Sequence, residues 1–287
     1  MRMQDNALAV KGLTKRYGQF ALENVSFSVP RGTVVGLVGE NGAGKSTTLN
    51  AALGLIHADA GSVELLGGQV QDGALREQIG VVFDANAFPN ALSPDRLNRI
   101  FRRIYRTWDE ERYRSLLRAM ELPADRKIGK LSKGMKMKLA IAVALSHGAK
   151  LLILDEATSG LDPIAREEIL DMLLDFVQAE DHAVLLSSHI TSDLEKIADF
   201  IVFLHAGRVI FEKPKDELRY RYGIVRCGAA QFAAIDKADR IAWRKQDYEW
   251  EVLVADREVA RKKYPKAVVD PATIDEIMLL HIKGERK

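Results

Sequence analysis

The stretch that decides the fold is TVVGLVGENGAGKSTTLNAALGLI, residues 33–56. It begins with a short apolar run rich in β-branched residues, which is typical of a buried strand. A glycine-rich loop follows, GENGAGK at residues 39–45, and the next residues, STTLNAALGLI, are typical of a helix. The stretch therefore predicts a strand, a loop and a helix in direct succession.

The loop matches the pattern glycine, four residues, glycine, lysine, serine, and a strand and a helix flank it as a phosphate-binding P-loop requires. Its glycines let backbone N–H groups converge on a phosphate, while Lys45 reaches the β- and γ-phosphates and Ser46 binds Mg²⁺. The alternative is a glycine-rich turn that only caps a helix. We expect ATP to contact Gly39, Asn41, Gly42, Ala43, Gly44, Lys45, Ser46 and Thr47.

Polar side chains also follow two further apolar runs. LLILDEA, residues 151–157, ends in two carboxylates, which places Asp155 and Glu156 at the sheet edge where open α/β sheets bind ligands. Asp155 is expected to hold Mg²⁺, and Glu156 to orient and deprotonate the attacking water. His189 follows AVLLSS and is placed to donate to the γ-phosphate. The alternatives are two solvated acids and a structural histidine.

The order of elements indicates an α/β protein. Apolar strand-like runs alternate with helical stretches such as PIAREEILDMLLDFVQAE, which predicts a mainly parallel sheet covered on both faces. The chain from Pro94 to about Glu121 is helical in pattern and strongly basic. Beyond Lys213 the segments are short and mixed, so we expect a main domain over 1–213 and a small α+β appendage over 214–287.

Composition limits the classes of partner. The chain is 47% apolar and 29% charged, and its formal net charge of +2 argues against a general attraction to nucleic acid. The single cysteine, Cys227, excludes an intrachain disulfide and a cysteine-based zinc site. The start of the chain lacks the features of a signal peptide, and no apolar run approaches the roughly 20 residues that span a bilayer. If the protein works at a membrane, another chain spans it.

A further helix, at LSKGMKMKL, residues 131–139, begins with an unusual charge distribution. Ser132 is a good N-cap, yet Lys133, Lys136 and Lys138 crowd the end of the helix where its dipole is already positive. Acidic residues would normally occupy these positions. The helix start therefore predicts a compensating anion.

Together, GENGAGKST, LSKGM, LLILDE, SGLD and SSHI resemble, in order and spacing, an ABC transporter ATPase over about residues 7–213. The resemblance implies a P-loop core with an antiparallel β subdomain and a helical subdomain at about 90–150. It also implies that the LSKGM loop faces the γ-phosphate of ATP held by a second subunit. The missing anion would then be a nucleotide bound by another chain.

The resemblance assigns roles residue by residue. Tyr17 matches the aromatic residue that stacks on adenine, although a strand-edge tyrosine is the plainer interpretation. Ser132 and Gly134 match the phosphate-contacting positions of the signature, and Asp162 matches the loop that couples the two sites. Asp162 followed by Pro163 is also a good helix start, and both interpretations can hold. His189 matches the switch histidine of the family.

Two positions depart from the family pattern. Asp84, in IGVVFDANAF, replaces the usual glutamine that senses Mg²⁺ and the transmembrane partner, and its carboxylate can bind the metal through water. In the signature, Lys133 replaces a glycine and Met135 a glutamine. The charge of Lys133 suits an anion-binding helix start, whereas the alternative is a solvated side chain.

A narrower resemblance concerns the type of transporter. The variants LSKGMKMKL and IGVVFD, the segment IYRTWDEERY and the closing PATIDEIMLLHIKG look like a Gram-positive branch of ATPases that serve ABC-2 exporters of peptides, antibiotics and other amphiphiles. The closing stretch predicts a helix that packs on its own domain or contributes to dimerisation.

The segment RLNRIFRRIYR, residues 96–106, holds five arginines and no acid. At helical spacing, arginines of this segment share one face. We expect this face either to be solvated, to dock on a membrane subunit or to contact anionic lipid head groups.

These observations favour an ATP-hydrolysing motor subunit of an exporter at the cytoplasmic face of the membrane. Its expected partners are a transmembrane permease and a second ATPase subunit, identical or closely related, and no nucleic acid is expected. One alternative is a non-transport ABC ATPase acting on ribosomes or DNA, against which stand the single P-loop and fewer than 50 residues between Asp84 and Leu131. Another is a module that binds nucleotide without turnover.

Overall fold

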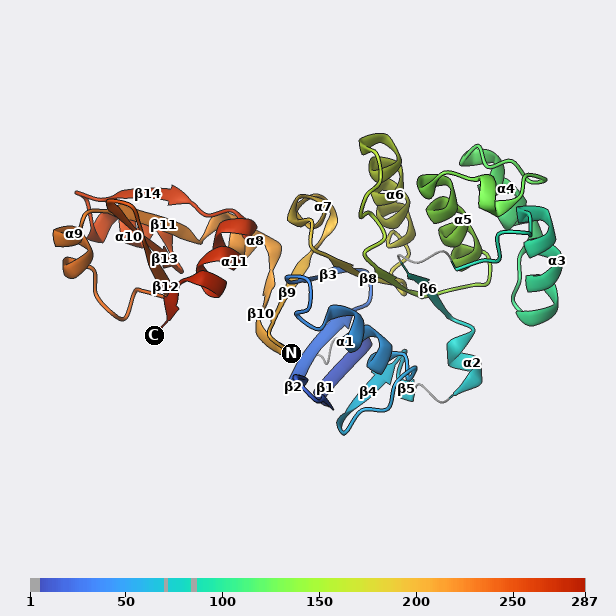
Figure 1. Ribbon diagram of the computed structural model, residues 1–287, viewed down its shortest axis with the longest axis horizontal. Helices are drawn as coiled ribbons and strands as arrows, with labels where there is room; N and C mark the ends of the chain where they lie inside the picture. Colours follow the sequence, from blue (N-terminus) through green and yellow to red (C-terminus); the bar gives the residue numbers. More distant parts are fainter. Residues whose placement is uncertain (1–5, 70–71, 84–86, 287) are drawn as a thin grey trace. The chain divides into compact units, whose positions relative to one another are not determined.

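The computed structural model describes residues 6–69, 72–83 and 87–286, and the chain forms two compact units, Met1–Phe211 and Glu212–Lys287 (Figure 1). Asp84, the predicted metal ligand, lies outside the described residues.

The first unit contains two sheets. The smaller one is antiparallel and has the strand order β2-β1-β4-β5. Its strands are β1 (Asn6–Tyr17), β2 (Phe20–Pro30), β4 (Ala60–Leu65) and β5 (Gly68–Gln69). The larger sheet has the strand order β10-β9-β3-β8-β7-β6. Strands β9, β3, β8, β7 and β6 are parallel to one another. Its strands are β3 (Val34–Val38), β6 (Ile79–Phe83), β7 (Leu151–Asp155), β8 (Ala183–Ser188), β9 (Phe200–His205) and β10 (Arg208–Pro214).

The central strands of the larger sheet are buried along their whole length. Every residue of β3, β7 and β8 is buried, as expected for parallel strands that are covered on both faces. The helices of this unit are α1 (Lys45–Ala52), α2 (Gly73–Arg76), α3 (Pro94–Ile104), α4 (Glu110–Ala119), the 3₁₀ helix η1 (Ile128–Lys130), α5 (Lys133–Leu145), α6 (Pro163–Phe176) and α7 (Thr191–Ile197).

The segment between β6 and β7 is helical and has a core of its own. Buried side chains of α3, α4, η1 and α5 form it, among them Leu97, Tyr113, Ile128 and Leu139. The stretch from Pro94 to about Glu121, expected to be helical, forms two helices, α3 and α4. A new helix starts after Asp109, whose carboxylate accepts from Arg112 N and caps α4.

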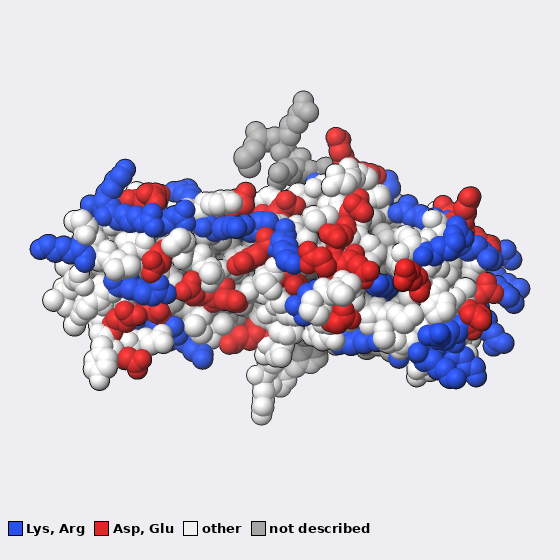
Figure 2. Space-filling view, turned by 90° about the horizontal axis from the view of Figure 1, so that it is seen from above, with Lys and Arg blue, Asp and Glu red and all other residues white. Residues whose placement is uncertain are grey.

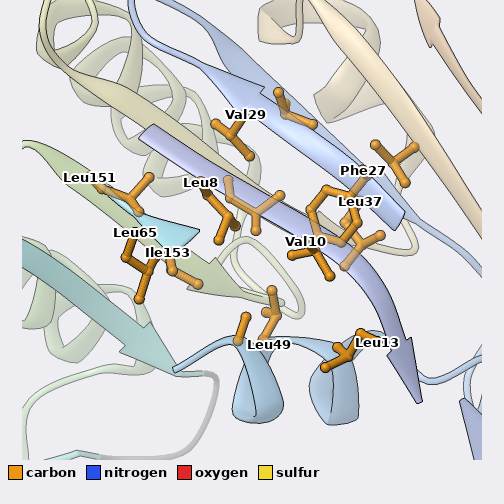
Figure 3. Packing of buried hydrophobic residues seen from close by; sticks show 14 of the residues in the cluster. Leu8, Val10, Leu13, Phe27, Val29, Leu37, Leu49, Leu65, Leu151 and Ile153 are labelled. Atoms are coloured by element: carbon orange, nitrogen blue, oxygen red, sulfur yellow. The ribbon is translucent and has the colours of Figure 1, made fainter. Parts of the chain in front are cut away.

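The two sheets of the first unit share one apolar core (Figure 3). Leu8 and Val10 of β1 lie beside Leu37 of β3 and Ile153 of β7, and Leu49 of α1 completes the cluster. Leu49 is fully buried, and truncating a buried leucine to alanine typically costs about 2–5 kcal/mol. The helix that follows the glycine-rich loop is therefore packed against the core that both sheets share.

Parallel pairing aligns the ends of the strands that carry the predicted site residues. In the register of the sheet, Val38 of β3 is opposite Ser188 of β8, and Asp155 of β7 is opposite Ser187. The chain leaves all three strands at the same edge. Residues that follow β3, β7 and β8 are therefore close in space although far apart in sequence.

The second unit has the expected α+β character. Its sheet has the order β14-β11-β13-β12-β15 and is antiparallel throughout, with β11 (Gly223–Cys227), β12 (Ala242–Gln246), β13 (Glu249–Val254), β14 (Val268–Pro271) and β15 (Glu285–Arg286). Its helices are α8 (Lys215–Tyr220), α9 (Ala229–Ala234), α10 (Arg257–Lys263) and α11 (Ile274–Lys283).

The last helix, α11, packs within its own unit. Thr273 and Glu276 form a capping box at its start, and Ile274, Ile277 and Leu280 are at most 2% exposed. Dimerisation through this unit would therefore have to use residues other than the apolar face of α11.

Across residues 6–69, 72–83 and 87–286, none of the helices has both the length and the apolar character needed to cross a bilayer.

One buried histidine connects the helical segment to the strand region. His147 follows α5, is 2% exposed and stacks on Tyr105 with ring centroids 4.3 Å apart. Its Nδ1 lies 2.8 Å from the carbonyl oxygen of Glu77, just before β6. Burial lowers the pKa of His147, because the charged imidazolium loses its hydration.

Lowering the pH from about 7.5 to about 5.5 is expected to reduce stability more in the native protein than in the variant His147→Phe. The pKa of His147 is lowered only in the folded protein, so the unfolded chain takes up the proton first as the pH falls, and stability is lost. Phenylalanine can stack on Tyr105 but cannot titrate. Thermal unfolding of both proteins at the two pH values measures the difference.

The matched control is His57→Gln, which removes an exposed histidine and so shows whether the loss of any histidine has the same effect as His147→Phe. Equal losses of melting temperature in the native protein and in His147→Phe would contradict the role assigned to His147.

Candidate functional site

The loop between β3 and α1 curls tightly, and its glycines are required for this. Gly42 and Gly44 have φ angles of 83° and 108°, a region that favours glycine. At Gly39 an added Cβ atom would lie 2.3 Å from the carbonyl oxygen of Leu204. Ala43 N donates to Glu40 O at 3.1 Å and closes the turn. The loop therefore has the conformation in which successive N–H groups can face one anion.

A cavity of about 300 Å³ lies at this loop and is lined by Phe20, Glu40, Asn41, Gly42, Gly44, Lys45, Ser46, Thr47 and Glu156. Of the loop residues predicted from the sequence, only Gly39 and Ala43 are not part of its wall. Phe20 and Glu40 are additional wall residues that the motif did not predict.

The ammonium group of Lys45 is surrounded by oxygen atoms. Lys45 is 5% exposed, and its Nζ donates to the carbonyl oxygen of Gly39 at 2.8 Å. The same Nζ lies 3.1 Å from Glu156 Oε1. Because Oε1 accepts no well-oriented hydrogen bond, the contact with Glu156 is mainly a charge interaction. A phosphate in the cavity would compete with Glu156 for this ammonium group.

Glu156 is held in place by its backbone as well as by its side chain. Its φ angle of 53° lies in the left-handed region, which costs a non-glycine residue about 1–2 kcal/mol. Its N–H donates to Ser187 O at 3.0 Å, and its Oε2 lies 2.6 Å from His189 Nδ1. The carboxylate of Glu156 therefore contacts both Lys45 and His189. These three residues follow three different strands, β7, β3 and β8.

Asp155 ends β7 and is 9% exposed. The hydroxyl of Ser187 donates to its Oδ1 and so orients the carboxylate. Ser46 is exposed at the start of α1 and lines the cavity. In the described part of the chain, no group of three or more His, Cys, Asp or Glu is arranged to hold a metal ion. One hydroxyl and one carboxylate beside nucleotide phosphates are, however, a donor set that Mg²⁺ uses.

Tyr17 lies at the end of β1, where it is 46% exposed. It is opposite Phe20 in the register of the hairpin, and the ammonium group of Lys15 lies 5.5 Å from its ring centroid. Phe20 lines the cavity, whereas Tyr17 does not. The ring of Tyr17 is thus accessible to a planar group from solvent.

The remaining predicted residues form a second group at the starts of α5 and α6. Ser132 Oγ accepts from Met135 N at 3.2 Å and caps α5, and Asp162 Oδ1 accepts from Ala165 N at 3.0 Å and caps α6. A Cβ atom at Gly134 would lie 3.1 Å from that of Ala165, so the two helix starts are in close contact. None of these residues lines the cavity at Lys45.

Comparison with known proteins decides the family. A family model described as ABC transporter matches residues 22–159. The lantibiotic transport ATP-binding protein SrtF of Streptococcus pyogenes is 35% identical over 212 residues, which are 73% of this chain and 91% of SrtF. The chain belongs to the ABC transporter ATP-binding family. The predicted family and the predicted fold class are both confirmed.

Other similar proteins support the same assignment for this ABC ATPase. The bacitracin transport ATP-binding protein BcrA of Bacillus licheniformis is 34% identical over 73% of this chain and 70% of its own. The ABC transporter ATP-binding protein YtrB of Bacillus subtilis is 27% identical over 94% of this chain and 96% of its own. The similarity to YtrB thus extends into the second unit.

Solved structures agree with the architecture. The ATP-binding subunit of an ABC transporter has a TM-score of 0.68 and 32% identity, over 74% of this chain and 92% of that chain. The cassette MJ0796, a dimer in a post-hydrolysis state with ADP and Pi, has a TM-score of 0.64 and 25% identity, over 72% of this chain and 98% of its own. The protein is an ATP-binding ABC subunit and an ATPase.

Besides the wall residue Glu40, sequence reasoning missed three features of this ABC ATPase. Phe20 was not predicted to line the cavity, although the turn GQ places it opposite Tyr17. The first serine of SSHI, Ser187, was not predicted to bind Asp155. No pattern in the sequence indicated that Lys133 contacts Ser159, since that contact joins residues 26 positions apart.

Glu156→Gln is expected to strengthen binding of ADP by about three- to tenfold. In this variant Lys45 has no ion pair with residue 156 that must be broken before its ammonium group binds a phosphate. ADP is chosen because its binding does not depend on hydrolysis. Equilibrium titration with a fluorescent ADP analogue measures the affinity.

The control is Glu40→Gln, which removes a carboxylate from the same cavity wall but keeps the backbone carbonyl that accepts from Lys45. Its effect is expected to be smaller than that of Glu156→Gln. Unchanged or weaker ADP binding by Glu156→Gln would show that the Lys45–Glu156 contact does not oppose nucleotide binding.

Proposed function

We propose that this ABC ATPase powers the export of peptides, antibiotics or other amphiphiles through a separate transmembrane permease, by ATP-driven head-to-tail pairing of two ATPase subunits. The observation that carries the proposal is the division of the site residues. Lys45 and Glu156 line one cavity and His189 contacts Glu156, whereas Ser132 and Gly134 lie at a different helix start that does not line it. One chain then supplies two different halves of a site.

In the first half-site, the chain binds and activates the reactants. The N–H groups of residues 39–47 and the ammonium of Lys45 bind the phosphates, which draws Lys45 away from Glu156. Glu156 then accepts a proton from the attacking water. Ser46 and Asp155 would hold Mg²⁺, which neutralises charge on the β- and γ-phosphate oxygens when bound.

His189 contacts the catalytic carboxylate with one ring nitrogen. Its Nδ1 lies 2.6 Å from Glu156 Oε2, and Nε2 is the ring nitrogen left to face a phosphate oxygen. The ring therefore connects the base to the γ-phosphate and orients the carboxylate at the same time. Tyr17, exposed beyond the cavity, stacks on the adenine.

In the second half-site, the start of α5 meets the γ-phosphate bound by the partner subunit. Ser132, the N–H groups of the first turn and the helix dipole all favour an anion there, and that turn contains no acid. Asp162 lies beside it at the start of α6 and joins the two half-sites. Hydrolysis removes the shared phosphate and permits the subunits to separate.

The cargo class rests on the relatives. SrtF is named for lantibiotic transport, BcrA for bacitracin transport and DrrA of Mycobacterium tuberculosis for doxorubicin resistance. We assign this chain a cargo of that class, handled by its permease at the cytoplasmic face of the membrane.

Pairing is tested with Glu156→Gln. With saturating ATP and Mg²⁺ this variant is expected to elute as a dimer in size exclusion, because ATP holds the two half-sites together and is not hydrolysed. Phosphate release is expected to fall by at least about 100-fold, the usual loss when a general base is removed.

Lys45→Ala, which lacks the phosphate-binding ammonium, serves as the blank and is expected to stay monomeric. A Glu156→Gln protein that remains monomeric at saturating ATP would refute the paired site. Equal phosphate release by the native protein and Lys45→Ala would refute hydrolysis at this site.

The exposed face of α3 is the surface that we assign to the permease. Arg96 and Arg103 are exposed, and neither forms an ion pair with a described residue, whereas Arg99 is paired with Asp95. Ile104, next to Arg103, is 59% exposed. Figure 2 shows Lys and Arg side chains gathered at the right-hand end of the view, where α3 and α4 lie. Such a face fits a cytoplasmic segment with apolar and acidic residues.

The double substitution Arg103→Glu and Ile104→Asp is expected to abolish co-purification of a polytopic membrane protein from detergent extracts of the native host. Reversing the charge and removing the apolar contact act on the same face. Mass spectrometry of the purified complex identifies and quantifies the membrane protein.

The matched control is Lys11→Glu, a charge reversal at an exposed position of β1. It is expected to retain the membrane protein. An unchanged yield with the double variant would show that α3 is not the docking face, and unchanged thermal unfolding of both variants shows that they are folded.

A further inference from the structure

Lys133, the residue that departs from the family's glycine, contacts the loop that precedes α6. It is the first residue of α5, and its Nζ donates to the carbonyl oxygen of Ser159 at 2.6 Å. A Cβ atom at Gly160 would lie 3.1 Å from the same Nζ. The lysine head thus lies directly against the backbone of residues 159–160.

The contacted loop starts at the catalytic carboxylate. Ser159 N donates to the carbonyl oxygen of Glu156 at 3.1 Å, and Leu161 N donates to that of Thr158 at 3.4 Å. Gly160 has a φ angle of 66°, which lets the chain turn toward Asp162. Glu156 and the N-cap of α6 are therefore joined by a short loop of fixed shape, and Lys133 binds the middle of that loop.

Two further contacts join α5 to α6 and to its N-cap. Gly134 lies against Ala165, with Asp162 Oδ2 4.0 Å from a Cβ atom built at Gly134, and Lys138 is paired with Glu168. Without the side chain of residue 133, neither of these would connect α5 to residues 158–161. A glycine at this position has no atoms with which to make the connection.

We propose that Lys133 is a positioning residue that fastens the start of α5 to the loop between Glu156 and Asp162. A movement of Glu156 in one half-site is thereby transmitted to Ser132 and Gly134, which serve the nucleotide of the partner subunit. The inference deepens the proposed function and rests on its paired half-sites. It assigns to Lys133 a contact within its own chain rather than a contact with phosphate.

The first test uses the full chain without nucleotide, so it does not depend on pairing or hydrolysis. Amide hydrogen exchange of residues 158–162, followed by NMR, is compared in the native protein, Lys133→Met and Lys133→Arg. Methionine keeps the length of the side chain but not the donor, and is expected to speed exchange about three- to tenfold. Arginine, which keeps the donor, is expected to restore the native rate.

The second test measures the ATPase kinetics of the same proteins. Lys133→Met is expected to lower kcat about three- to tenfold while KM for ATP stays within about twofold, because the P-loop is untouched and only the assembly of the paired site is impaired. Lys133→Arg is expected to recover kcat. Lys130→Met, an exposed lysine on η1, is the matched control and should change neither exchange nor kcat.

Native exchange rates at 158–162 in Lys133→Met would overturn the tether, whatever the ATPase does. A lowered kcat with native exchange rates would place the lysine on the partner's phosphate instead. Faster exchange with native kcat would reduce the contact to a structural one and overturn the positioning role. If the native protein itself fails to pair with ATP, the proposed function fails, and the exchange result still decides whether the tether exists.

Discussion

The site depends on the parallel pairing of β3, β7 and β8. These strands are buried along their whole length, so their register is set by the core, and a slip by one residue would turn every side chain to the opposite face. Their aligned ends then bring Lys45, Glu156 and His189 together. The left-handed backbone of Glu156 is tolerated because the buried strand before it and the bond to Ser187 fix its position.

The parts of the site that follow a buried strand could be predicted from the sequence. An apolar run that stops at Asp155 or at Ser187 marks both the strand and its polar end, and the glycines before Lys45 mark the loop. The parts that depend on contacts between distant segments could not be predicted. Phe20 and Ser187 have ordinary local patterns, and only the register of the sheets shows what they face. The break between α3 and α4 was likewise hidden by a continuous helical pattern.

The positive start of α5 illustrates the same limit. Three lysines near a helix N-terminus are unfavourable in a local electrostatic account. In the folded chain Lys138 is paired with Glu168 of α6, and Lys133 donates to a backbone carbonyl. Long-range partners therefore remove part of the unfavourable charge. What remains is a turn with the Ser132 cap, the helix dipole and Lys136, which is suited to an anion from outside the chain.

Three consecutive charged residues of α6 connect the helices that follow the two groups of site residues. Glu168 is paired with Lys138 of α5, whereas Glu167 is paired with Lys196 of α7, the helix that follows His189. The Glu167–Lys196 pair is exposed and contributes only about 0–1 kcal/mol to stability, whereas the side chain of Lys138 is only 14% exposed. Arg166 differs, because its partner on α7, Asp193, is 2% exposed and 3.8 Å away. A buried acid held at that distance makes the junction of α6 and α7 more costly to change than the exposed pair alone would. Helix α6 is therefore joined by charged contacts to both α5 and α7, so a displacement of α6 would disturb both neighbouring helices.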